Sequence, residues 1–187
     1  MIMLQDLILL IVGAGIGIVS SIAAHLVIRI SDNTGKLKVY AKIVYSKVGD
    51  GETWGCRKMQ DVESFHIPLW IEVVNTANTT AVIRDFCIYA YKNNTMIAKM
   101  DQINRINDTV LANNGGYSFV VEPRTVKKLE FHFALKKTEV AGADFNELRI
   151  GYFTIRDSKN MFHFRNVDDS WSLEKRDIDE DWKLVNR

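Results

Sequence analysis

The side chains best suited to chemistry in this chain are four histidines and two cysteines. His132 and His163 each stand between two phenylalanines, in segments where apolar and polar residues alternate as in a strand. If the phenylalanines face a core, both imidazoles point outward and could be neighbours on one sheet face, as weak metal ligands. The Cx2C and HExxH spacings of zinc sites do not occur. We therefore expect structural histidines, with no metal and no cofactor.

Other catalytic patterns are missing as well. The sequence has no nucleophile elbow, no phosphate-binding loop and no carboxylate pair at a recognisable spacing, so we expect no enzymatic activity. The glycines of residues 13–17 superficially resemble a dinucleotide-binding loop, but Ile18 stands where the third glycine belongs and no strand precedes them. Cys56 and Cys87 could form a disulfide on an oxidising side of a membrane and would stay thiols in the cytoplasm.

Four tryptophans are the candidates for contacts with a partner. Trp70 points away from the expected core side of its strand, and Trp54 lies in a glycine-rich loop. Trp171 and Trp182 lie in the last 20 residues of the chain. Indole rings are frequent anchors of protein interfaces, and burial inside the domain is the alternative. The sequence thus indicates Trp54, Trp70, Trp171 and Trp182 as candidate partner-binding residues.

The element that would position such a surface is an apolar anchor. Residues 7–28 carry no charge and are bracketed by Asp6 and Arg29. A helix of about 20 apolar residues crosses the hydrocarbon core of a bilayer, which is about 30 Å thick. We predict an N-terminal tail and transmembrane helix over residues 1–30. A cleaved signal peptide is the alternative, because Ser21 and Ala23 suit a signal peptidase, although no Lys or Arg precedes the apolar run.

Charges around the anchor predict its orientation. Arg29, Lys36, Lys38 and Lys42 follow the span, and no basic residue precedes it. Positive residues stay on the cytoplasmic side of a membrane. We expect a single-pass protein of the cell membrane whose C-terminal domain is cytoplasmic, with the extracytoplasmic orientation left open.

A stripe of small residues runs along the same helix. Gly13, Gly17 and Ser21 are spaced by four, which places them on one helix face. Small side chains let two helices approach closely in lipid. The stripe predicts self-association of the anchor.

After a polar hinge at residues 31–35, apolar residues recur with period two, as in half-buried strands. Pro68 cannot donate a ladder hydrogen bond, so we expect its strand at a sheet edge or a bulge. Strands are expected at residues 36–46, 64–75, 81–91, 96–100, 117–121, 125–135, 148–156 and 161–165. Short strands separated by turns, without a long amphipathic helix, predict an antiparallel β-sandwich over residues 36–167, or an eight-stranded barrel.

The tail, residues 168–187, differs from this body. It contains seven acidic and four basic residues, which leaves the rest of the domain basic. Trp171, Ile178, Trp182 and Val185 have a spacing that predicts a short helix with one apolar stripe. The helix either docks on the basic body or recruits a partner.

Residues 36–136 resemble bacterial immunoglobulin-like modules of the CARDB and FxLYD type. The resemblance rests on an Asn-rich turn at residues 74–78, on a strand that ends at residues 89–94 with two tyrosines, and on Pro123 before a strand with the Phe131-His132-Phe133 motif. The loop at residues 113–116 is longer than is usual in those families. The resemblance implies an immunoglobulin-like sandwich and a non-enzymatic binding or spacer role.

Near-balanced charge, with 24 basic and 23 acidic residues, gives no indication of a nucleic-acid partner. Together these features predict a membrane-anchored, non-enzymatic binding or assembly module of prokaryotic or phage type, whose partners are the lipid bilayer and a protein or a second copy. The alternative is a ligand-sensing membrane effector, in which a barrel binds a small molecule and the transmembrane helices oligomerise. A polar-lined cavity would favour the sensor, and an apolar core the binding module.

Overall fold

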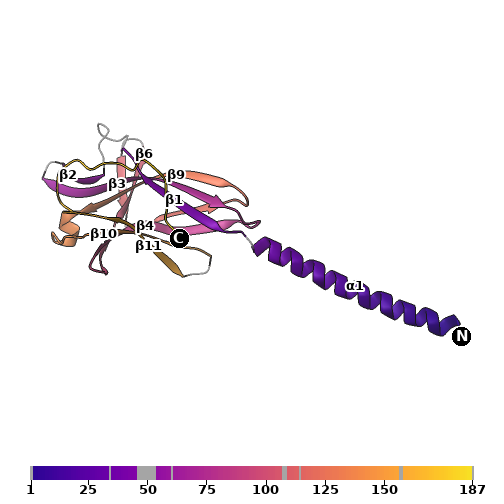
Figure 1. The fold of residues 1–187 in the computed structure, drawn as a ribbon. Coiled ribbons are helices and arrows are strands. Elements are labelled where there is room, and N and C mark those ends of the chain that lie inside the picture. The colour runs from indigo at the N-terminus through magenta and orange to yellow at the C-terminus, as the bar shows by residue number, and fades with distance from the viewer. Residues whose placement is uncertain are drawn as a thin grey trace.

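The computed structural model describes residues 2–33, 35–45, 54–59, 61–106, 109–113, 115–155 and 158–186. One long helix, α1 (Ile2–Asn33), extends from a β domain (Figure 1). Residues 31–33, expected as part of a hinge, belong to α1. Gly35 follows, and an added Cβ there would lie 2.0 Å from Ala77 Cα. Only glycine therefore fits at this close approach of two backbones.

α1 contains the whole uncharged run at residues 7–28, and the prediction of a helix there is confirmed. Its described side chains, those of Leu9 and residues 13–28, are all exposed. No helix in the described part of the chain is long and apolar enough to cross a membrane. The expected transmembrane span is accordingly not found there.

The β domain consists of two antiparallel sheets. The larger sheet has seven strands in the order β12, β1, β3, β9, β6, β7, and β2 also pairs with β3. Its strands are β1 (Leu37–Ile43), β2 (Gly55–Met59), β3 (Val62–Asn75), β6 (Asp101–Ile106), β7 (Thr109–Asn113), β9 (Val126–Lys136) and β12 (Lys183–Leu184). A short 3₁₀ helix, η1 (Lys137–Val140), follows β9.

The smaller sheet has five strands in the order β11, β10, β4, β5, and β8 also pairs with β4. Its strands are β4 (Ala81–Lys92), β5 (Thr95–Lys99), β8 (Tyr117–Val121), β10 (Glu147–Phe153) and β11 (Lys159–Asn166). The mainly antiparallel β fold is thus confirmed, and two sheets around one core are consistent with a sandwich. In the described chain the ladders do not join into the single eight-stranded barrel of the alternative.

All eight expected strands are present, with ends shifted by a few residues. The Asn93-Asn94 turn between β4 and β5 has positive φ at both residues (49° and 65°), as a tight hairpin turn requires. The sequence did not reveal β2, β6, β7 or β12. Their short segments lack the regular alternation of apolar residues that marks the other strands.

β3, which contains Pro68, is an interior strand of the larger sheet, so the expected sheet edge is present only locally, as a gap in the ladder on one side of Pro68. β3 lies between β9 on one side and β1 and β2 on the other. Pro68 lies where the partner changes, because the β2 ladder ends at His66 and the β1 ladder begins at Leu69. No ladder partner is needed at that point, so the missing N–H costs little.

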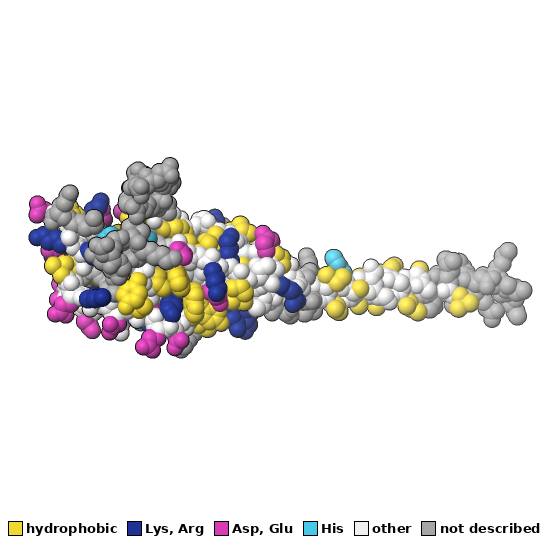
Figure 2. Space-filling view, turned by 90° about the horizontal axis from the view of Figure 1, so that it is seen from above, with side chains coloured by type: hydrophobic (Ala, Val, Ile, Leu, Met, Phe, Trp, Pro, Cys, Tyr) yellow, Lys and Arg dark blue, Asp and Glu magenta, His cyan; other side chains and the backbone are white. Residues whose placement is uncertain are grey.

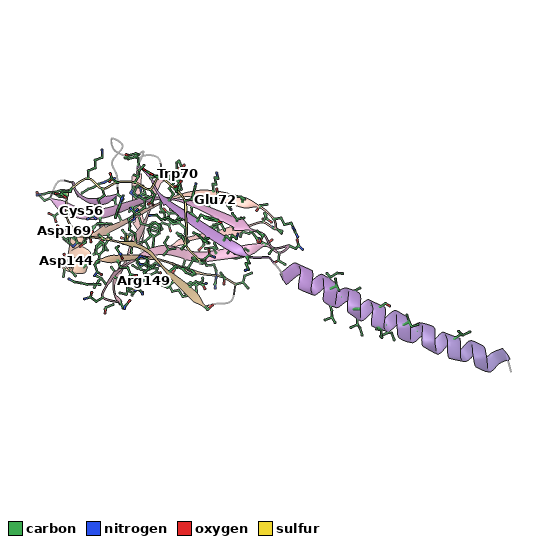
Figure 3. All side chains as sticks on the ribbon, viewed as in Figure 1. Cys56, Trp70, Glu72, Asp144, Arg149 and Asp169 are labelled. Carbon is green, nitrogen blue, oxygen red and sulfur yellow. The ribbon has the colours of Figure 1, made fainter. Side chains whose placement is uncertain are left out.

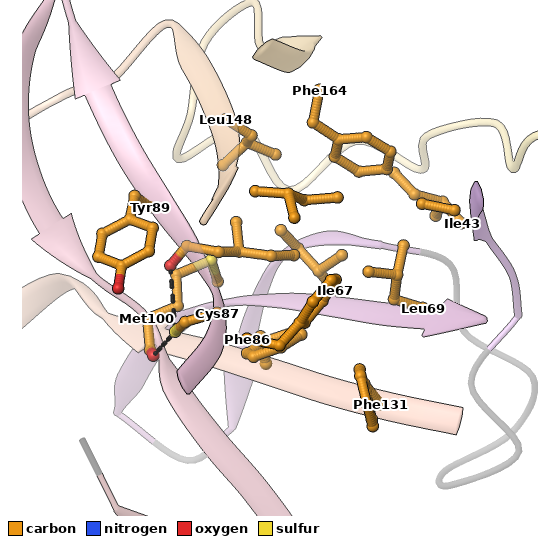
Figure 4. Packing of buried hydrophobic residues seen from close by; sticks show 14 of the residues in the cluster. Ile43, Ile67, Leu69, Phe86, Cys87, Tyr89, Met100, Phe131, Leu148 and Phe164 are labelled. Atoms are coloured by element: carbon orange, nitrogen blue, oxygen red, sulfur yellow. Dashed lines mark hydrogen bonds between the residues drawn. The ribbon is translucent and has the colours of Figure 1, made fainter. Parts of the chain in front are cut away.

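The core lies between the two sheets and consists of apolar side chains from both (Figure 4). The inward residues of β3 belong to the same buried cluster as Phe86 and Ile88 of β4. Among the largest fully buried side chains are Tyr89, Tyr152, Phe65, Phe86, Phe133 and Phe145. The buried polar side chains of the described residues are those of Ser64, Asn75, Ser170 and Asp179.

The acidic tail is part of the domain and contains no helix in its described residues. β12 pairs with β1, and Val185 N donates to Val39 O at 2.8 Å. The predicted short helix was therefore wrong: the tail pairs with β1 at an edge of the larger sheet, and that pairing requires an extended backbone. Trp171 and Val185 are buried as expected, but from an extended chain.

Candidate functional site

The outer face of the larger sheet exposes one tryptophan, Trp70. Its side chain is 38% exposed on β3, between Lys42 of β1 and Glu130 of β9 as cross-strand neighbours. Figure 3 shows Trp70 and Glu72 on the same outer side of the sheet. A central, exposed indole flanked by both signs of charge is suited to contact a protein. We call these four residues, Lys42, Trp70, Glu72 and Glu130, the Trp70 face.

Trp54 and Trp171 lie inside the domain, where they are 5% and 8% exposed. Phe65 connects them, with its ring centroid 6.0 Å from that of Trp54 and 6.4 Å from that of Trp171. Phe145 completes the cluster at 5.0 Å from Phe65. Both indole N–H groups donate to backbone carbonyls, that of Trp54 to Asp177 and that of Trp171 to Ala143. These two tryptophans therefore serve packing and not an exposed surface.

Trp182 is half-buried on the tail, three residues after the buried carboxylate of Asp179. Asp179 is 4% exposed and accepts hydrogen bonds from Ile43 N (2.9 Å), from Arg165, and from Lys183 Nζ (2.5 Å). Asp179 N donates to Ile43 O at 3.1 Å. The carboxylate thus fixes the tail to the end of β1. We call this group the Asp179 clamp.

Two histidines come together on the outer face of the larger sheet. His66 Nδ1 of β3 lies 3.4 Å from His132 Nε2 of β9, and His66 Nε2 lies 2.7 Å from Ser64 Oγ. The sequence correctly indicated that His132 faces away from its flanking phenylalanines, but its neighbour is His66. His163 lies on the smaller sheet and contacts Glu147 at 2.9 Å.

Burial controls the charge of this pair. It lowers the pKa of both His66 and His132 to about 4, with a contribution from neighbouring positive charge. Both rings are therefore neutral near pH 7 and linked to Ser64 as a hydrogen-bonded chain. Two imidazole nitrogens at this separation could hold a metal ion, but the described residues offer no group of three or more His, Cys, Asp or Glu ligands.

Tyr117 of β8 ties the smaller sheet to the larger one beside this pair. Its hydroxyl accepts from His132 N at 3.1 Å and lies 3.0 Å from Ile103 O. Its ring stacks on Phe131 with centroids 3.8 Å apart. The hydroxyl takes the place of a strand partner where the β6 ladder ends, which holds the backbone of His132 in place.

The two cysteines are free and buried, on different sheets. Burial raises the pKa of the Cys87 thiol to about 12, and it also raises the pKa of the Cys56 thiol. Cys87 Sγ donates to Met100 O at 3.0 Å. Both groups are poor nucleophiles in this state, because the thiolate is the reactive form.

The stripe of Gly13, Gly17 and Ser21 lies on an exposed stretch of α1. An added Cβ on Gly13 or Gly17 would meet no atom within 4 Å. The glycines are therefore not required for packing within the chain. This leaves the stripe open to another helix.

Comparisons with protein-family models, with curated proteins and with solved structures found no match for this chain. The immunoglobulin-like resemblance therefore stays a prediction. Sequence reasoning missed Asn75 and Asp179, the buried polar residues that organise the two ends of the domain. An Asn after a strand and an Asp in an acidic tail both resemble ordinary solvated turn residues, so no local signal distinguished them.

Proposed function

We propose that this protein is a membrane-anchored, non-enzymatic binding or assembly module that presents an immunoglobulin-like β domain at the membrane surface. The observation that carries the proposal is the surface of α1. Its described large apolar side chains are 54–70% exposed: Leu9, Ile16, Ile18, Val19, Ile22, Leu26, Val27 and Ile28. They lie on all sides of the helix, and a helix that is apolar all round needs a non-aqueous cover.

A bilayer suits this helix because residues 7–28 carry no charge and basic residues follow them. The positive residues support a cytoplasmic position for the β domain. Small residues on one face support association of two anchors, which would bring two Trp70 faces together and raise the affinity for a multivalent partner. Trp70 would then contact that partner.

The composition of the core supports this proposal over the ligand sensor. A sensor requires a polar-lined cavity for its small molecule. The described core is filled by aliphatic and aromatic side chains. The buried hydroxyls of Ser64 and Ser170 have partners within the chain, His66 and Phe145 N.

Fractionation of cells that express the full chain tests the anchor. We expect the chain in the membrane fraction, resistant to salt and released by detergent. Ile16→Lys combined with Val19→Lys should move it to the soluble fraction, because each lysine near the centre of a span costs about 2.5–3.5 kcal/mol. Val62→Lys combined with Leu173→Lys changes two exposed apolar residues of the domain and is the control. A soluble wild-type chain would refute the anchor.

Cross-linking in membranes tests the assembly step. Gly17→Ile should abolish a cross-linked dimer, because a large side chain keeps the helices apart. Gly15→Ile places the same side chain on the opposite side of α1 and should leave the dimer intact. Equal effects of the two substitutions would remove the stripe from the proposal.

Photo-cross-linking tests the binding surface. A photoreactive residue in place of Trp70 should give a discrete adduct in cells, whereas the same residue in place of Leu173 should not. Both positions are exposed, at 38% and 57%. Adducts of equal yield at the two sites would mean that the Trp70 face is not selective.

A further inference from the structure

Several segments meet at the end of the β domain that α1 enters. β1 begins there beside the end of β3, with Leu37 opposite Asn75. β9 begins there, with Val126 opposite Val74, and β8 ends there, with Val121 opposite Ala81. β10 also ends at this side, with Phe153 opposite Arg84. We call this end the helix-proximal rim; it comprises residues 35–38, 76–80, 120–127 and 154–155.

Asn75 gives the rim a defined structure. Its buried side-chain amide donates to the carbonyls of Thr79, Val121 and Glu122 at 2.9–3.1 Å. Its carbonyl oxygen accepts from Ala77 N at 3.0 Å. One side chain thus joins the turn after β3 to the loop after β8. Both segments belong to the motifs on which the immunoglobulin-like resemblance rests.

The junction with α1 is held to the same turn. Lys36 N donates to Thr76 Oγ1 at 2.8 Å, and Thr76 N donates to Lys36 O at 3.1 Å. The close approach of Gly35 to Ala77 adds to these bonds. The rim therefore follows directly from the end of the helix.

Positive charge on the rim is not balanced by carboxylates. Among the described residues, Lys36, Lys38, Arg124 and Lys127 form no ion pair. Arg124 Nε donates to Asn78 Oδ1 at 2.5 Å, and Lys127 Nζ donates to Val120 O at 2.8 Å, so both cations have neutral partners. The one acidic residue of the rim segments is Glu122. In Figure 2 the acidic side chains gather mainly toward the end of the domain away from α1.

Exposed apolar side chains accompany these cations. Val120, Val126 and Ile155 are 42%, 55% and 68% exposed. In Figure 2 hydrophobic and basic side chains are mixed on the part of the domain next to the helix. Apolar residues among unpaired cations match the boundary of a bilayer, where acyl chains lie below anionic headgroups.

We propose that the helix-proximal rim docks on the surface of an anionic bilayer, with Lys36, Lys38, Arg124 and Lys127 on the headgroups and Val120, Val126 and Ile155 at the acyl boundary. This proposal rests on the proposed membrane anchor, and it adds a defined orientation of the β domain relative to the membrane. Docking holds the β domain upright on the membrane, so that the Trp70 face stands at right angles to the lipid surface and stays free for a partner.

The test uses the full chain in nanodiscs that contain spin-labelled lipids as quenchers. Ile155→Cys carries an environment-sensitive fluorophore, and Glu174→Cys carries it on the exposed tail as the distal control. The buried thiols of Cys56 and Cys87 do not compete for the label. We expect strong quenching at residue 155 in phosphatidylglycerol, weak quenching there in phosphatidylcholine, and weak quenching at residue 174 in both.

Charge variants then test the cations. Arg124→Gln combined with Lys127→Gln should lower the ratio of docked to undocked domains about 25-fold, which is about fivefold for each charge removed. Lys58→Gln combined with Lys175→Gln removes two exposed cations outside the rim and should leave quenching unchanged.

The outcomes separate the two proposals. A chain that enters neither nanodisc refutes the anchor itself. A chain that enters the nanodiscs but shows equal quenching at residues 155 and 174 overturns rim docking and leaves the anchor in place. Equal quenching at residue 155 in both lipids, or no response to the Arg124 and Lys127 substitutions, overturns the role of anionic headgroups.

Discussion

The two ends of the β domain are closed in different ways. At the end away from α1, Trp54, Phe65, Phe145 and Trp171 pack edge to face, and the Asp179 clamp binds its own cations. At the helix-proximal rim, Asn75 joins the loops with neutral hydrogen bonds, and cations remain without carboxylate partners among the described residues. The first end pairs Arg165 and Lys183 with Asp179 and packs its rings together, although Arg176 there donates only to backbone carbonyls and its buried Nε has no hydrogen-bond partner among the described residues. The second leaves its charge for an external partner.

The largest effect should come from the aromatic end. Trp171→Ala removes a buried indole and leaves a cavity beside Phe65, so we expect a loss of about 4 kcal/mol in the free energy of unfolding. Trp70→Ala is the matched control and should cost less than about 1 kcal/mol, because that ring is partly exposed. Urea unfolding of the full chain, followed by circular dichroism, measures both. Similar losses would mean that the two tryptophans do not differ in role.

The Asp179 clamp should come next. Asp179→Ala leaves Arg165, Lys183 and Ile43 N without their shared acceptor, and we expect a loss of about 3 kcal/mol. Asp181→Ala removes an exposed carboxylate of the same tail and should have little effect. Protease digestion gives a second readout, because a released tail should be cleaved first. If the two variants are equally stable, the clamp does not hold the tail.

The rim should respond to the loss of Asn75. Asn75→Ala deprives three carbonyls of their donor, and we expect a loss of about 2–3 kcal/mol. Asn78→Ala changes a neighbouring amide in the same turn that is only half-buried, and it should cost less. Hydrogen exchange at residues 76–80 and 122–125 should increase in the first variant. Unchanged exchange there would contradict the organising role of Asn75.

Between the two ends, the His66 and His132 pair predicts a pH dependence. Their pKa of about 4 in the folded state lies below the usual 6.5, so the unfolded chain binds protons first as the pH falls. The contribution of this pair to the free energy of unfolding should be fully present above pH 6.5 and decline between pH 6.5 and 4. After allowance for solvent screening, we expect the free energy of unfolding at pH 5 to be about 2 kcal/mol lower than at pH 7.

Urea midpoints from pH 7 to pH 4.5 measure this decline. His66→Gln combined with His132→Gln should flatten the profile, whereas His163→Gln, an exposed position on the smaller sheet, should not. A profile that keeps its slope in the double variant would exclude the pair as its source.

Much of the fold could be predicted from the sequence. Period-two alternation in β1, β3 and β9 marked both the strands and their inward faces, because a half-buried strand imposes that pattern on its residues. The orientation of Trp70 followed from the same rule. β2, β6, β7 and β12 are short and lack regular alternation of apolar residues, so no local pattern revealed them, although β2 pairs with β3 and β6 with β7 across short connections.

The candidate sites were less accessible to prediction. Trp54 and Trp171 have the residue type of an interface anchor, and only their contacts with Phe65 show that they are buried. The periodic apolar residues of the tail suggested a helix. The tail instead runs extended, and its backbone pairs with β1. His132 was matched with the wrong histidine, because alternation gives the face of a residue and not its neighbour on the next strand.

The sequence by itself determined which segments form the helix and most strands, where the uncharged run lies, and which side chains point inward. These properties depend on spacing along the chain, and spacing can be read directly. The tertiary structure alone decided that the tail is part of the sheet, that Asn75 and Asp179 close opposite ends, and that unpaired cations gather beside α1. These depend on contacts between residues up to about 150 positions apart, such as Val39 with Asn186. Only folding brings such residues within the few ångströms over which hydrogen bonds and packing act.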